Sequence, residues 1–271
     1  MTEGAQAGTP SATGDGAALP ETLRREVKVR RKKSEKKRFF ERLVRKAKRL
    51  NATHAVHGNV PVFDNAAFPW AAGIEREWRL IRAELDRVLE RQEELPAFHE
   101  VVSEFKTITR DRYWKTFFLL GYGSRSERNI ELCPETWRIV RKIPGLKTAM
   151  FSILEPGKHL PAHKGPYNGV LRLHLGLRIP EPRDKAAIRV HDRVCHWEEG
   201  KVLIFDDYFK HEAWNGTDGT RVVLFVDFVK PLRFPANVVN WLLLNLAPFT
   251  PFVREAQENQ KKWEARFHRG R

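Results

Sequence analysis

The chain has 271 residues, of which 41% are hydrophobic, enough to bury a substantial core. Its two cysteines exclude a disulfide framework and a cysteine-rich zinc site, which predicts a reducing, intracellular compartment. The net charge of +15 is uneven: residues 21–50 hold 15 Lys and Arg against 4 Glu, which leaves only +4 for the other 241 residues. A near-neutral body with one basic arm argues against a specific nucleic-acid-binding protein and is typical of an enzyme with a surface-binding tail.

The first 50 residues divide into two parts. Residues 1–20 are rich in Gly, Ala, Ser and Thr, which predicts a disordered tail without the features of a secretory signal. Residues 21–50 predict a basic amphipathic helix, because apolar side chains recur at helical spacing among Lys and Arg. Two interpretations of this helix stay open: it binds an anionic membrane surface, or it packs its apolar stripe on the body. The stripe consists of Phe39, Phe40, Leu43, Val44, Ala47 and Leu50.

Residues 51–112 predict a helical lead-in to the next part of the chain. Pro, Asn and Gly indicate a loop over 52–69, and the apolar spacing from Ile74 to Leu89 predicts a helix over 70–94. A shorter helix over 134–142 is expected to begin near Pro134. No apolar run reaches the length of about 18 residues that would indicate a membrane-spanning helix.

From Ala149 onward, the pattern changes to short β segments separated by turn signals such as Pro156-Gly157. This pattern predicts a mainly β core, either a sandwich or a jelly roll. Residues 233–271 predict an apolar patch around Trp241 followed by a helix, and the patch suits either a membrane-facing surface or packing on the body. The expected strands are 149–154, 170–177, 187–190, 202–205, 211–214 and 221–229.

Two histidines and one arginine are the strongest candidates for chemistry. His163 lies in His-Lys-Gly-Pro, and His211, in His-Glu-Ala-Trp, precedes Arg221 by ten residues. Two imidazoles can hold a borderline divalent metal, and a guanidinium can bind a carboxylate. If a hairpin is centred on Gly216, His211 and Arg221 lie opposite each other and share a face, although a bulge would shift this register. The plain alternative for a lone histidine is a surface residue or a satisfied core residue.

Other motifs carry less information. In the segment 170–177, leucines alternate with Arg172 and His174, a pattern that an ordinary half-exposed strand also explains. Gly121-Tyr122-Gly123 lacks the third glycine of a dinucleotide-binding loop.

From about Tyr113 to Leu232, the chain resembles the aspartyl/asparaginyl β-hydroxylase family of Fe(II)- and 2-oxoglutarate-dependent dioxygenases. The resemblance implies a double-stranded β-helix domain over 113–232, in agreement with the strand pattern. The matching segments are 151–157, 163–166, 171–177, 197–207 and 211–214, together with Arg221.

The resemblance implies that His163 and His211 ligate iron. Many related enzymes place a third ligand, a carboxylate, two residues after the first histidine. That position is Gly165 here, and the family members that hydroxylate Asp or Asn also lack the carboxylate. Asp206 or Asp207 is an alternative source of a carboxylate, although a structural role is expected for both.

The resemblance also implies a binding site for the co-substrate 2-oxoglutarate, which is used together with O₂. Arg221 and Ser152 would hold its distal carboxylate. His174 and Arg172 would contact its other end or the substrate. Trp114 would line the pocket.

The substrate is left open by the resemblance. Family members that hydroxylate Asp or Asn carry Arg at the position of Val170, and its absence weakens the case for an acidic substrate. A bacterial branch that hydroxylates acyl chains of lipid A is also similar, although its members carry Asp at the position of Gly165. The segments shared with that branch are 114–118, 132–136, 143–145, 149–151 and 166–167.

The expected function is therefore hydroxylation of a C–H bond, either in a peptide Asp or Asn side chain or in a lipid acyl chain. The alternative is a catalytically inactive binding protein that acts through its basic arm. The expected location is the cytoplasm, or the inner face of the membrane if the arm binds there.

Overall fold

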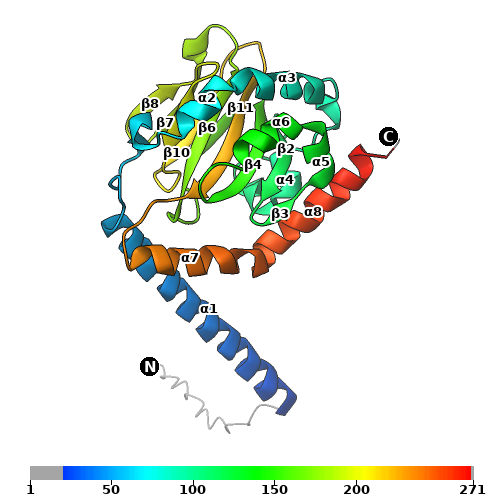
Figure 1. Cartoon of the computed structure of the whole chain (residues 1–271). Coiled ribbons are helices and arrows are strands. Elements are labelled where there is room, and N and C mark those ends of the chain that lie inside the picture. The colour runs from blue at the N-terminus through cyan, green and yellow to red at the C-terminus, as the bar shows by residue number, and fades with distance from the viewer. Residues whose placement is uncertain (1–20, 270–271) are drawn as a thin grey trace, which may run out of the picture. The chain divides into compact units, whose positions relative to one another are not determined.

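A computed structural model describes the fold of residues 21–269 (Figure 1), so the predicted tail 1–20 lies outside the described residues. Helix α1 (Glu21–Thr53) confirms the helix expected over 21–50. Residues up to Lys46 and residues from Ala47 form two separate compact units. In the first unit, the side chains of Phe39, Phe40 and Leu43 are exposed. In the second, Ala47 is buried and Leu50 packs against a small apolar cluster.

The second unit is built on two antiparallel sheets, which confirms the predicted double-stranded β-helix. The larger sheet has the strand order β1-β9-β6-β11-β4-β2-β3, and the smaller has the order β5-β10-β7-β8. The strands are β1 Val62–Phe63, β2 Trp114–Gly121, β3 Ser124–Arg125, β4 Leu146–Leu154, β5 His159–His163, β6 Val170–Arg178, β7 Ala186–Val190, β8 Arg193–His196, β9 Val202–Phe205, β10 His211–Asn215 and β11 Arg221–Val229.

The two faces of the larger sheet bury different partners. One face packs on the smaller sheet, since Met150 and Val223 share an apolar cluster with Leu160 and Ile188. The other face is covered by helices, whose apolar side chains join the main core cluster. The helices of the second unit are α2 Ala71–Arg76, α3 Trp78–Leu89, α4 Phe98–Val101, α5 Glu127–Leu132, α6 Pro134–Val140, α7 Ala236–Leu246 and α8 Pro251–Phe267.

All six predicted strands are confirmed, and α6 confirms the helix expected near Pro134. The helix expected over 70–94 is instead two helices, α2 and α3, that meet at Glu77. Five strands were not predicted, namely β1, β2, β3, β5 and β8. Strand β2 is buried along nearly its whole length and so lacks alternation, and β5 is short and contains Pro161.

The predicted hairpin around Gly216 is wrong. Strands β10 and β11 belong to different sheets: His211 pairs with His163 of β5 and Val190 of β7, whereas Arg221 pairs with Leu154 of β4. The connection between β10 and β11 crosses from one sheet to the other. The Asn215 side chain holds this crossing, because its Nδ2 donates to three carbonyl oxygens, those of Leu154, Glu155 and Gly219, at 2.8–3.1 Å.

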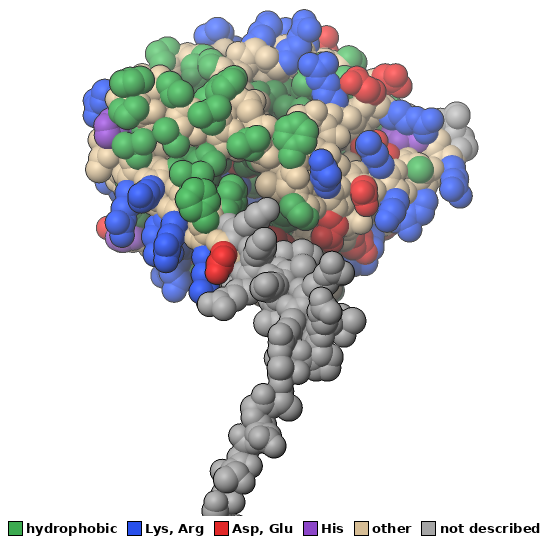
Figure 2. All heavy atoms as spheres, turned by 90° about the horizontal axis from the view of Figure 1, so that it is seen from below, with side chains coloured by type: hydrophobic (Ala, Val, Ile, Leu, Met, Phe, Trp, Pro, Cys, Tyr) green, Lys and Arg blue, Asp and Glu red, His purple; other side chains and the backbone are tan. Residues whose placement is uncertain are grey.

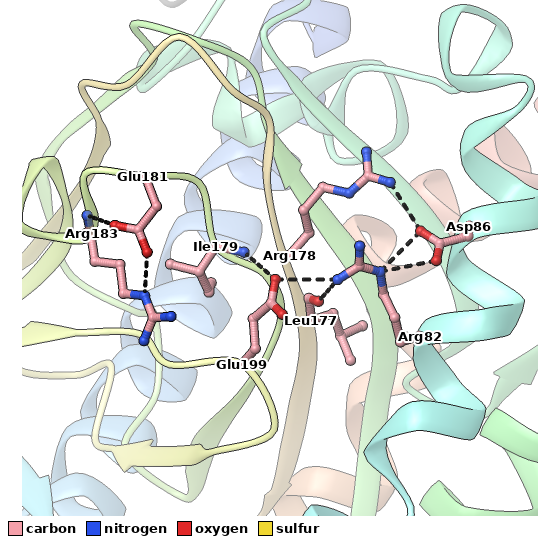
Figure 3. Close-up of polar contacts among 8 residues, drawn as sticks. All are labelled: Arg82, Asp86, Leu177, Arg178, Ile179, Glu181, Arg183 and Glu199. Carbon is pink, nitrogen blue, oxygen red and sulfur yellow. Dashed lines mark hydrogen bonds and ion pairs between the residues drawn. The ribbon is translucent and has the colours of Figure 1, made fainter.

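Charged side chains fix α3 to the end of β6 and to Glu199 (Figure 3). Arg82 pairs with Asp86 at 3.0 Å and with Glu199 at 3.2 Å, and its guanidinium also donates to the Leu177 carbonyl oxygen. Arg178, at the end of β6, pairs with the same Asp86 at 3.0 Å. These contacts hold α3 against the larger sheet. They do not line the space between the two sheets.

Two helices close the described chain. Helix α8 buries Val253, Trp263 and Phe267 in the body. Helix α7 buries Asn240 and Leu244 but exposes much of its apolar surface. Within residues 21–269, no helix is by itself long and apolar enough to cross a membrane, and 236–249 with 251–267 reach that length and composition only as a pair bent by 50°.

Candidate functional site

The two sequence-predicted histidines lie side by side. His163 ends β5, His211 begins β10, and the register of these strands places them opposite each other, with ring centroids 4.2 Å apart. Each Nδ1 contacts a backbone carbonyl oxygen, His163 that of Pro161 at 2.8 Å and His211 that of Phe209 at 3.0 Å. A carbonyl can only accept, so each Nδ1 carries the proton and each Nε2 keeps a free electron pair, the form in which imidazole binds metals.

Burial favours the neutral form of both imidazoles. It is the main cause that lowers the pKa of His211 to about 3, with His163 and Arg172 adding to the effect. The pKa of His163 is also lowered, first by burial. Neutral imidazoles are ready to bind a metal without first losing a proton.

A side chain at position 165 would have to displace Asp207. A Cβ atom on Gly165 would lie 2.3 Å from Oδ2 of Asp207, far inside van der Waals contact. The Asp207 carboxylate therefore occupies the space that a side chain at position 165 would need. Across the described chain, no group of three or more His, Cys, Asp and Glu surrounds a common metal position. A metal at this place would therefore have the histidine pair as its protein donors.

The two neighbouring aspartates play different parts. Asp206 forms an ion pair with Lys230 at 2.7 Å, with both side chains 1% exposed, which is the structural role expected for it. Asp207 is also buried, yet only its Oδ2 has a partner, Nη2 of Arg172 at 2.9 Å, and its Oδ1 has none. Burial raises the pKa of Asp207 to about 7. Sequence reasoning named Asp207 without giving it this place beside the histidines.

Arg172 is held by the protein itself. Its guanidinium contacts Asp207 and Asp227, each at 2.9 Å, and stacks 4.1 Å from the ring centroid of Phe225. These contacts position the Asp207 carboxylate. The contact of Arg172 with co-substrate or substrate stays a prediction.

Arg221, the first residue of β11, has a buried charge without a partner. It is 2% exposed, donates to the Ser152 carbonyl oxygen at 3.3 Å, and leaves its Nε unsatisfied. No carboxylate of the described residues pairs with it, and burial lowers its pKa to about 9. Burying an unpaired charge is costly, so this site favours an anionic ligand. The Ser152 hydroxyl lies close by and accepts a hydrogen bond from Nε1 of Trp114 at 3.0 Å.

Trp197 links Arg221 to His174 and was given no role by sequence reasoning. Its ring lies 4.4 Å from the Arg221 guanidinium, and its Nε1 donates to Nδ1 of His174 at 3.3 Å. His174 is therefore protonated on Nε2, which is buried and has no partner. Phe205 contacts both His174 and His211, with ring centroids 5.0 and 6.0 Å away, so the arginine side and the histidine pair share one space between the sheets.

The lead-in contributes an aromatic wall that sequence reasoning missed. Phe98 of α4 stacks on Trp114 with centroids 4.1 Å apart. Phe105, in the short 3₁₀ helix after α4 (Ser103–Thr107), lies 6.3 Å from the His163 ring. Beside His211, a surface depression of about 320 Å³ opens between Ala162 and the charged side chains of β7 and β10.

These residues fit a metal ion together with a small carboxylate ligand. The metal would take the two free Nε2 atoms, and the ligand would meet an unpaired guanidinium and an unused Nε2–H donor. The structure thus brings together His163, His211, Arg221, Ser152, His174 and Trp114, as the sequence predicted.

Comparisons with known proteins identify the family of the chain. A family model described as aspartyl/asparaginyl beta-hydroxylase matches residues 75–231. An ornithine lipid ester-linked acyl 2-hydroxylase from Rhizobium tropici is 64% identical over 231 residues, covering 85% of this chain and 82% of that protein. The human aspartyl/asparaginyl beta-hydroxylase is 36% identical over 167 residues, covering 60% of this chain and 21% of that protein. A solved prolyl-4-hydroxylase from Pseudomonas putida, at 16% identity and a TM-score of 0.38 over 59% of this chain, is too distant to argue from.

Proposed function

The chain belongs to the aspartyl/asparaginyl β-hydroxylase family, and we propose that it uses Fe(II) and 2-oxoglutarate to hydroxylate carbon 2 of an ester-linked acyl chain in ornithine lipid. The observation that carries the substrate is the 64% identity to the Rhizobium tropici enzyme across most of both chains. Val170 supports this lipid substrate, because family members that hydroxylate Asp or Asn carry Arg at that position. An inactive protein acting through its arm is not favoured, because the chain keeps the residues that fit metal and co-substrate.

His163 and His211 would hold the iron, and their Nδ1–carbonyl contacts would fix the direction of both rings. When bound, Fe(II) with 2-oxoglutarate and O₂ supplies the oxidation: one oxygen atom enters the substrate C–H bond, and the co-substrate becomes succinate and CO₂. Asp207, held by Arg172, presents its unpartnered Oδ1 as a hydrogen-bond acceptor on the Gly165 side of the histidine pair.

Arg221 would bind the distal carboxylate of 2-oxoglutarate and so gain the counter-charge that the protein does not provide. The Ser152 hydroxyl would add a hydrogen bond at the same end. Nε2–H of His174 would donate to an oxygen of the bound co-substrate. Phe98, Phe105 and Trp114 exclude water from the space in which the reaction takes place.

The test uses the purified full-length chain with Fe(II), 2-oxoglutarate and detergent-solubilised ornithine lipid. Mass spectrometry should find the lipid heavier by one oxygen atom, and fragmentation should place that atom on carbon 2 of the ester-linked chain. The opposing result is an unchanged lipid together with oxidation of an Asp- or Asn-containing peptide. That result would replace the lipid by a peptide substrate.

We also propose that the enzyme works at the inner face of the cytoplasmic membrane, with the basic part of α1 bound to anionic lipid. The exposed Phe39, Phe40 and Leu43 among Lys and Arg support this placement. Cell fractionation should find the protein with membranes at low salt and released by high salt. A protein that stays in the soluble fraction at low salt would contradict the placement.

A further inference from the structure

Helix α7 and the short 3₁₀ helix that follows it (Ala247–Phe249) leave an apolar face uncovered. The helix has no charged residue, and its buried face already packs on the body through Ala236, Asn240 and Leu244. Figure 2 shows hydrophobic side chains gathered on the face of the molecule seen from below, with Lys and Arg around them. The α7 patch consists of six side chains that are 46–76% exposed, namely Phe234, Val238, Trp241, Leu242, Leu246 and Phe249.

The composition of this region favours a lipid surface as the partner. A helix that is apolar on both faces is expected to be buried on both, so the α7 patch needs a cover. No Asp or Glu occurs between Asp227 and Glu255, while Arg233 and Arg254 flank the patch and are exposed. Aromatic side chains bordered by arginine, without any acidic residue, complement an anionic bilayer.

The length of α7 decides how it would meet the bilayer. Its 11 residues extend about 16 Å, roughly half the thickness of the hydrocarbon core. Helix α8 cannot extend it across the membrane, because Trp263 and Phe267 are buried in the core of the body. The α7 patch is therefore suited to lie in the plane of the interface.

Helix α7 also contacts loop 164–169, which directly follows His163. Nδ2 of Asn240, on the buried face of α7, donates to the Gly169 carbonyl oxygen at 2.8 Å. A Cβ atom on Gly169 would lie 2.0 Å from Oδ1 of Asn240, so the loop and the helix are in tight contact. On its other side, the loop is held by Asn51, whose Nδ2 donates to the Tyr167 hydroxyl at 3.0 Å. Loop 164–169 thus has a fixed position relative to the α7 patch.

We propose that the α7 patch inserts into the interface of an anionic phospholipid bilayer and so sets loop 164–169 and the His163 side of the site against the membrane. This inference deepens the proposed function and rests on it for the identity of the substrate. Carbon 2 of an ester-linked acyl chain adjoins the ester carbonyl, so it lies at the top of the hydrocarbon region. A shallowly inserted helix brings the site to that depth without extracting the whole lipid.

The test measures binding of the full-length chain to floating vesicles of phosphatidylcholine with or without phosphatidylglycerol. Binding is measured in about 0.5 M NaCl, where the screening length of about 4 Å suppresses the contribution of the basic arm. Leu242→Ser and Trp241→Ser should each weaken binding by roughly tenfold or more, since each removes a side chain that inserts. Leu80→Ser is the matched control, because Leu80 is 44% exposed against 49% for Leu242 and belongs to α3, a helix at the opposite end of the body from α7 (Figure 1). The control should bind like wild type.

Several results would overturn the proposal. These are no binding of wild type in high salt, equal losses in Leu80→Ser and Leu242→Ser, or patch variants that lose self-association in sedimentation while their vesicle binding is unchanged. The last result would assign the patch to a second copy of the chain.

The failure of the docking proposal can be told from the failure of the proposed function. Wild type that hydroxylates detergent-solubilised lipid but does not bind vesicles refutes the docking alone. Patch-dependent binding without hydroxylation in either form of lipid refutes the proposed function alone.

Discussion

At the scale of single residues, the site is defined by groups whose usual partners are missing. Arg221 is buried without a carboxylate, His174 has an unused Nε2–H, and Asp207 has an unused Oδ1. Such groups cost free energy in the folded protein, and a native structure keeps them where a ligand supplies the partner. Their convergence beside the histidine pair is the physical basis for assigning metal and co-substrate to this space.

Arg221→Met separates a binding role from a structural one. Removing a buried, unpaired charge should leave the ligand-free protein as stable as wild type or more stable by about 1 kcal/mol, seen as an equal or higher Tm. The variant should lose the rise in Tm that 2-oxoglutarate with Mn(II) gives to wild type, and its KM for 2-oxoglutarate should rise at least tenfold. A lower Tm with an unchanged response to 2-oxoglutarate would assign Arg221 to the core instead.

Gly165→Asp places a carboxylate at the position where many related enzymes carry one. It should not improve the site, because its Cβ would collide with the Asp207 carboxylate. We expect a loss of about 1–3 kcal/mol in stability and weaker binding of Mn(II) in calorimetry. Gly73→Ala is the control, since a Cβ there meets only an arginine tip at 3.7 Å. Tighter Mn(II) binding by Gly165→Asp would show that position 165 has room for a ligand.

The protonation of His211 can be followed directly in the metal-free protein. Its pKa in the fold is about 3 against an ordinary 6.5, so between these values the unfolded chain binds a proton that the fold excludes. This contribution lowers stability as the pH falls from 6.5 toward 3. Asp207, with its pKa raised to about 7, acts in the opposite sense as the pH falls below 7. Ring ¹⁵N NMR shifts should report a neutral His211 at pH 5, and a midpoint near 6.5 would contradict its burial.

At the scale of secondary structure, periodicity predicted six of the eleven strands, but the one pairing it suggested was wrong. The segments 170–177 and 221–229 have the alternation or the β-branched composition of strands, and both are strands. The chain around Gly216 has the composition of a hairpin turn, so sequence alone could not tell a tight turn from a crossing between sheets. The deciding contacts are those of Asn215 with Leu154 and Glu155, some 60 residues away.

Asn215→Ala tests the crossing from β10 to β11. The substitution removes the three hydrogen bonds that Nδ2 donates and the two that Oδ1 accepts from Thr217, so we expect a loss of about 2–3 kcal/mol in urea unfolding. Since the crossing sets Arg221 relative to His211, the KM for 2-oxoglutarate should also rise. Asn245→Ala is a suitable control, because Asn245 is exposed on α7 and donates only to the Trp241 carbonyl oxygen. Equal stabilities of the two variants would refute the role of Asn215.

At the scale of the whole molecule, the chain combines a dioxygenase-type body with two surfaces suited to lipid. The family resemblance predicted seven site residues because they lie in dense motifs. The fold shows how strands far apart bring six of them together, while Arg172 is held by Asp207 and Asp227. Trp197, Phe98 and Phe105 escaped sequence reasoning because apolar aromatic residues look alike whether they line a site or fill a core. Sequence reasoning could not predict the exposure of the α7 patch either, because this exposure depends on which face of the helix the body covers.

The most direct measurement of the central claim is the ratio of succinate formed to lipid hydroxylated, with Fe(II), 2-oxoglutarate and vesicles that contain ornithine lipid. The account predicts about one succinate per hydroxylated acyl chain, a rate that rises with ornithine lipid in the vesicles, and loss of both products in His211→Ala. Succinate formation that does not respond to ornithine lipid, with no hydroxylated chain detected, would contradict it.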